Sequence, residues 1–104
     1  MSVVTVYVVF ADVEEAMRIG RTVVDDRLAA CINILAPCTS FYWWEGVVAQ
    51  SEEVPALLKT TLEGADLLIE RVSELHSYDV PAIVVWPVDR LAANFGDWVE
   101  AEIR

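Results

Sequence analysis

Residues 29–61, AACINILAPCTSFYWWEGVVAQSEEVPALLKTT, decide the fold of this chain. Apolar, β-branched and aromatic residues dominate both halves, and Glu45-Gly46 between them is a turn signal. The pattern predicts an extended run over 29–45, interrupted at Pro37, and a returning strand over 47–61. An extended run of that length spans about 55 Å, whereas a compact domain of this size is roughly 33 Å across. The hairpin must therefore bend sharply or reach beyond its own domain.

Four consecutive aromatic residues, 41–44, lie just before the turn. Each can bury about 150–250 Å², so they are poor candidates for exposure to water. Contact with another subunit is the simplest remedy, and a monomer with a strongly bent hairpin is the alternative. Pro55 has no N–H to donate, so its stretch is expected at a sheet edge or a bulge.

Two strand-helix patterns flank the hairpin. Residues 3–10 predict a strand buried on both faces, and Asp12 with Glu15 then forms a capping signal for an amphipathic helix. After the hairpin, a helix is expected over 62–75 with Thr61 as its cap, followed by a strand over 82–88 and a terminal helix capped near Asn94. The order β-α-β-β-α-β predicts one α+β domain over residues 1–104, a ferredoxin-like sandwich with both main helices on one sheet face.

Composition narrows the class of protein. Hydrophobic residues make up 56% of the 104 and mean hydropathy is +0.43, yet no run approaches the roughly 18 apolar residues of a membrane span. The N-terminus shows no signal-peptide pattern, so the cytoplasm is the expected location. The net charge of −10 argues against nucleic acid as a partner and suits a cation, although most surface carboxylates serve solubility.

Few residues carry chemistry. His76 is the only histidine, and it suits either a helix-terminal cap or a metal ligand. Cys31 suits either a buried thiol or a ligand for copper or zinc. The second cysteine is Cys38. If the segment between Cys31 and Cys38 is extended, the two residues lie about 23 Å apart, which excludes a disulfide. No nucleophile motif or glycine-rich phosphate loop is present, so neither an enzyme nor an organic cofactor is expected.

Several short motifs resemble the CutA family of divalent-cation-tolerance proteins over residues 4–99. In chain order they are Arg27-Leu28-Ala29-Ala30-Cys31-Ile32-Asn33-Ile34, Tyr42-x-Trp44-Glu45-Gly46, Glu53, Lys59-Thr60 and His76-x-Tyr78-x-x-Pro81. Their joint order and spacing make chance agreement improbable.

The resemblance implies a cytoplasmic homotrimer of ferredoxin-like subunits packed with their sheets toward one another. It also implies binding of divalent cations, copper in particular, with a role in cation tolerance and no established catalysis. By this analogy Cys31, His76 and Asp79 are the expected metal contacts. The side chains expected to line an inter-subunit cleft are those of Trp44, Lys59 and Tyr78.

Residues 76–83, HSYDVPAI, depart from the family pattern H-P-Y-E-x-P-E-I. Asp79 keeps a carboxylate on a shorter side chain, and Ala82 removes the second carboxylate, so a copper site here loses one ligand. Besides the leading hypothesis of a trimeric metal-binding protein, two others stay open. One is a PII-like trimeric module that senses a small molecule or docks a protein, and the other is a purely structural role.

Overall fold

The computed structural model describes residues 2–104. Within them lie five strands and three helices in the order β1, α1, β2, β3, β4, α2, β5, α3. Their bounds are β1 Val3–Phe10, α1 Val13–Asp25, β2 Cys31–Ile34, β3 Cys38–Trp44, β4 Val47–Thr61, α2 Ala65–Leu75, β5 Ile83–Pro87 and α3 Ala93–Glu102. The predicted β-α-β-β-α-β order with a terminal helix is confirmed, with the first strand of the hairpin divided into β2 and β3.

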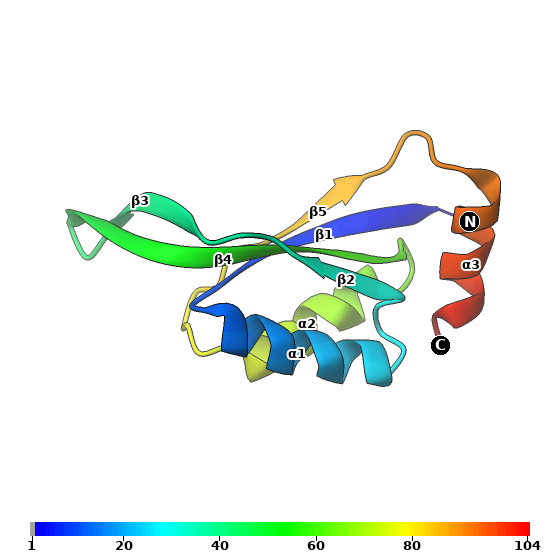
Figure 1. The fold of residues 1–104 in the computed structure, drawn as a ribbon, viewed down its shortest axis with the longest axis horizontal. Helices are drawn as coiled ribbons and strands as arrows, with labels where there is room; N and C mark the ends of the chain where they lie inside the picture. Colours follow the sequence, from blue (N-terminus) through cyan, green and yellow to red (C-terminus); the bar gives the residue numbers. More distant parts are fainter. Residues whose placement is uncertain (1) are drawn as a thin grey trace.

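The sheet is antiparallel throughout and has the order β2-β4-β1-β5, with β3 pairing the outer part of β4. Helices α1 and α2 lie side by side against one face, while α3 packs at the end of the sheet near the N-terminus (Figure 1). None of the three helices found in residues 2–104 lies against the other face, which we call the open face. This matches the ferredoxin-like sandwich expected from the element order.

The core lies between the sheet and the two main helices. Alternate residues of β1, from Val4 to Phe10, point toward it, and they pack against fully buried Ile19 of α1 and Leu68 of α2. Strand periodicity sends the intervening residues to the open face. There Tyr7 stacks on Trp86 with ring centroids 5.1 Å apart.

Helix α1 begins as the sequence predicts, because the Asp12 carboxylate accepts a hydrogen bond from the Glu15 N–H at 2.8 Å. Two other helix starts were predicted wrongly. Helix α2 begins at Ala65 rather than Leu62, since the Thr61 hydroxyl accepts from the Gly64 N–H within a turn that precedes the helix. Helix α3 begins at Ala93, and its start has no side-chain cap, so the expected cap at Asn94 is absent.

The central hairpin reaches beyond its own domain instead of folding back. Residues 47–53 of β4 pair only with β3, whereas residues 54–61 pair with β1 and, at 56–59, with β2 on the other side. The resulting arm projects past the rest of the sheet (Figure 1), and the domain measures 45 × 26 × 23 Å. At the arm's end Glu45 and Gly46 have φ of 50° and 83°, the two positive values that a type I′ turn requires. Phe41 and Trp43 near this turn are 70% and 75% exposed.

Pro55 lies in a central strand, opposite Val9 of β1, rather than at an edge or in a bulge of β4. Its carbonyl accepts from the Leu35 N–H at 3.0 Å. The N–H and the carbonyl of a residue in an antiparallel strand point to the same side. The nitrogen of Pro55, which has no hydrogen to donate, therefore faces the interruption between β2 and β3. That interruption, which contains Pro37, allows a proline at this central position.

Candidate functional site

His76 lies directly after α2 and is held from both ring nitrogens. Nε2 donates to the Val9 carbonyl at 2.8 Å, and Nδ1 accepts from the Tyr78 N–H at 3.0 Å. The ring stacks on Phe10, with centroids 5.4 Å apart, and its side chain has no exposed surface. These bonds correspond to a neutral imidazole protonated on Nε2. In this arrangement the ring anchors the segment after α2 to β1.

Glu15 joins the same cluster from the first turn of α1. One carboxylate oxygen accepts from the Ala11 N–H and the other from the Ser77 N–H, both at 3.0 Å. Burial raises the pKa of the carboxyl, but the hydrogen bonds from Ser77 and Ala11 outweigh burial and leave the pKa below its ordinary value. Glu15 therefore ties the β1–α1 junction to the segment after α2 as an anion.

Tyr78 extends this cluster to the hairpin. Its hydroxyl donates to Glu53 Oε2 at 2.8 Å, and its ring lies 4.9 Å from that of His76. Burial raises the pKa of the phenol, and the hydrogen bond and negative charge of Glu53 raise it further, so Tyr78 remains a donor at neutral pH. A continuous set of contacts thus runs from the start of α1 to the base of the projecting arm.

A groove of about 720 Å³ opens beside this cluster. We call it the hairpin groove; it is lined by hairpin residues 40–44, by residues 77–80, and by Val9, Glu53 and Ala82. Among the residues predicted for the site, Trp44, Tyr78 and Asp79 line this groove and His76 lies directly behind it. The volume falls in the range of small-molecule sites.

Cys31 and Lys59 lie elsewhere. They face each other across β2 and β4, in register with Thr5 of β1. His76 contacts Val9, four residues further along β1, or about 13 Å away along the strand. The Cys31 thiol is half-buried, and burial raises its pKa despite the opposing effect of Lys59.

One chain therefore does not assemble the predicted metal site. Across residues 2–104, no three side chains of His, Cys, Asp or Glu are placed so that they could hold a metal ion. His76 would have to give up a hydrogen bond to become a ligand, and Cys31 is too distant to join it. The predicted set omitted Glu53, although Glu53 is one of the motif positions of the family resemblance. Its bond to Tyr78 spans 25 residues of sequence, so local patterns do not reveal that contact.

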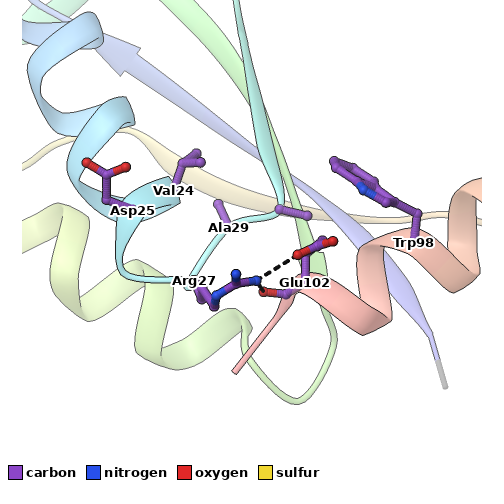
Figure 2. Close-up of a pocket in the computed structure, with 7 residues that line it drawn as sticks. Val24, Asp25, Arg27, Ala29, Trp98 and Glu102 are labelled. Carbon is purple, nitrogen blue, oxygen red and sulfur yellow. Dashed lines mark hydrogen bonds and ion pairs between the residues drawn. The ribbon is translucent and has the colours of Figure 1, made fainter.

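A second, smaller pocket of about 290 Å³ lies between the end of α1 and α3 (Figure 2). Arg27 and Glu102 form an ion pair of 2.7 Å at its edge, and Trp98 forms one wall. The other carboxylate, Asp25, pairs with Arg21 at 3.0 Å. Both acidic groups of this pocket are thus already satisfied within the chain.

The fold and groove define a class of protein: a ferredoxin-like domain whose central hairpin projects past its own sheet and forms a groove with the segment after α2. Residues 4–102 match the family described as CutA1 divalent ion tolerance protein. The chain belongs to this family. It is a family of non-enzymatic tolerance proteins, in agreement with the expectation that the chain is not an enzyme.

Individual relatives agree over nearly the whole chain. A divalent-cation tolerance protein CutA of Pyrococcus horikoshii is 41% identical over 97% of this chain and 98% of its own length. The structure of a periplasmic divalent cation tolerance protein CutA from Archaeoglobus fulgidus superposes with a TM-score of 0.94 at 33% identity, covering 98% of this chain and 99% of that one. A chloroplastic CutA 1 of Oryza sativa is 33% identical over 97% of this chain and 57% of its own length.

Proposed function

We propose that this protein is a homotrimer that binds divalent cations, Cu²⁺ in particular, and thereby contributes to cation tolerance. Membership of the divalent ion tolerance family is the observation that carries the proposal. The net charge of −10 favours attraction of cations over anions.

The exposed apolar surface supports the assembly. Trp86 and Val84 on the open face are 44% and 47% exposed, and the aromatic arm adds Phe41 and Trp43. Apolar areas of this kind on a small domain mark protein-protein contacts. Three copies packed through their open faces would cover the sheet and give each arm a neighbouring subunit to contact.

The proposed ligands are Cys31, His76 and Asp79, with Trp44, Lys59 and Tyr78 around them. Since Cys31 is distant from the other two within one chain, the proposal requires that a site draw ligands from two subunits. Thiolate and imidazole are ligands that copper prefers. In the trimer, the segment 77–80 would contact the neighbouring subunit and so bring His76 and Asp79 close to it.

The test combines sedimentation with calorimetry. We expect a trimer at micromolar concentration and heat from Cu²⁺ binding that Cys31→Ser removes. Cys38→Ser is the matched control, because Cys38 is the other free cysteine of the described chain and lies on β3. Equal Cu²⁺ binding by both variants would refute the assignment of Cys31, and a stable 11.6 kDa species would refute the trimer.

The second candidate function is a PII-like trimeric module for a small molecule or a partner protein. The hairpin groove favours this function, because one chain forms the groove by itself. The proposed metal ligands, in contrast, do not come together within residues 2–104 of one chain. A thermal-shift comparison of metals with metabolites separates the two candidates, since only a ligand of the folded state raises Tm.

The expected cytoplasmic location is likewise a proposal. Residues 2–104 contain no helix with the length and apolar character to cross a membrane, and the relatives include proteins described as periplasmic and as chloroplastic. Fractionation of the native cells tests the location directly.

A further inference from the structure

Aromatic rings approach the hairpin groove from two sides. Tyr42 lies on the hairpin, where its hydroxyl is 3.1 Å from the Ser51 hydroxyl. Tyr78 comes from the segment after α2 and is fixed by Glu53 and His76. Ser51 and Glu53 are two residues apart on β4, so their side chains share one side of the hairpin with Tyr42. The two tyrosines therefore border the same part of the groove.

The charge of this part of the groove is negative. Glu53 lines it although only 7% of the residue is exposed, and Asp79 lines it further out. None of the described residues that line the groove is Lys, Arg or His. Within residues 2–104, Glu53 forms no ion pair, and its neighbour Tyr78 is a neutral donor. A carboxylate with so little water around it attracts a cation more strongly than one on the open surface.

We propose that the hairpin groove binds an organic ammonium ion, with the charged nitrogen beside Glu53 and the alkyl groups against the rings of Tyr42 and Tyr78. Aromatic faces attract such cations and replace the water that a large, weakly hydrated ammonium ion gives up readily. A metal ion is a poorer occupant, because among residues 2–104 no three side chains of His, Cys, Asp or Glu are grouped so that they could hold one. An anionic ligand would be repelled.

The inference concerns a different ligand from the proposed function. All the residues it uses belong to one chain, and it requires neither Cys31 nor a copper site. A neighbouring subunit is the alternative occupant of the groove, so binding is measured on the protein in its native assembly, with the oligomeric state recorded by sedimentation.

Calorimetry with choline is compared with calorimetry with 3,3-dimethylbutan-1-ol, which has the same shape and no charge. We expect choline to bind at least about tenfold more tightly, as cation–π contact and a buried carboxylate together imply. Glu53→Gln removes the charge and keeps an acceptor for Tyr78, and it should weaken choline binding about tenfold. Glu52→Gln is the matched control, since it removes the same charge from an exposed neighbour on the opposite side of β4.

Tyr42→Leu provides a second variant if Glu53→Gln folds poorly, and we expect it to weaken choline binding about threefold or more. Equal affinities for choline and its neutral isostere, or equal losses in the Glu52 and Glu53 variants, would overturn the proposal. No choline binding by the intact assembly would also overturn it and would assign the groove to a neighbouring subunit. Cu²⁺ titrations of the same variants report on the metal function separately, since none of the proposed metal ligands is altered.

Discussion

Glu15 offers a direct test of how the segment after α2 is held. Its carboxylate accepts two backbone hydrogen bonds, from Ala11 and Ser77, at a residue that is only 5% exposed. In Glu15→Gln the amide oxygen can serve one N–H, while the amide NH₂ faces the other. One buried N–H then lacks an acceptor, which costs about 1–3 kcal/mol. The remaining hydrogen bond is weaker, because its acceptor is no longer charged. We expect the free energy of unfolding to fall by about 3 kcal/mol.

The control is Glu14→Gln, which removes the same charge from the adjacent, exposed position of α1. Substitutions at such positions change stability by about 0.5 kcal/mol or less. Urea unfolding, followed by tryptophan fluorescence at one fixed protein concentration, measures both variants. If the two were equally stable at pH 7, the hydrogen bonds of Glu15 would not carry the stability assigned to them.

The effect of Glu15 also depends on pH. Its pKa in the folded protein lies below the ordinary value of 4.5, so the folded state binds the proton less well than the unfolded state. The stabilisation is complete above pH 4.5 and is lost as the pH falls through the folded pKa. We therefore expect the difference between the wild type and Glu15→Gln to shrink below pH 4.5. A difference that stays constant from pH 7 to about pH 3 would contradict this linkage.

Three further substitutions test particular features of the fold by chemical denaturation. Arg27 has φ of 60°, so Arg27→Gly should be about 1 kcal/mol more stable than Arg27→Ala; the reverse order would refute backbone strain there. Leu68→Ala should cost about 2–5 kcal/mol because Leu68 is fully buried. Its exposed neighbour provides the control, and Leu67→Ala should change little. Gly46→Ala should cost about 1 kcal/mol, since φ is 83° while no atom crowds the site; a neutral result would mean that the turn relaxes.

Local patterns accounted for most of the secondary structure. Strand alternation, helical periodicity and the Asp12 cap depend on residues close in sequence, so they could be predicted without the fold. The start of α2 could not, because Thr61 caps a turn that continues β4 and the helix begins after it. Residue type alone does not identify the buried face of α1 either, because Met17 is 60% exposed whereas Ile19 is fully buried.

The candidate site was predictable in part. Motif resemblance pointed to His76, Tyr78 and Asp79, and the structure places the segment that carries them beside the hairpin groove. It could not indicate that both nitrogens of His76 are already bonded, one of them to Val9, 67 residues earlier. Nor could it indicate the distance between Cys31 and His76, which depends on the register of three strands.

By itself the sequence determined the order of strands and helices, the family and the overlong hairpin, because each depends on residue type, spacing or length. Only the tertiary structure decided that Pro55 fits a central strand, that Glu15 binds Ser77, and that Glu53 meets Tyr78. The contacts of Glu15 and Glu53 join residues 25 or more positions apart, and the fit of Pro55 depends on the strands beside it. The geometry in each case is set by strand register and by the packing of α2 against the sheet.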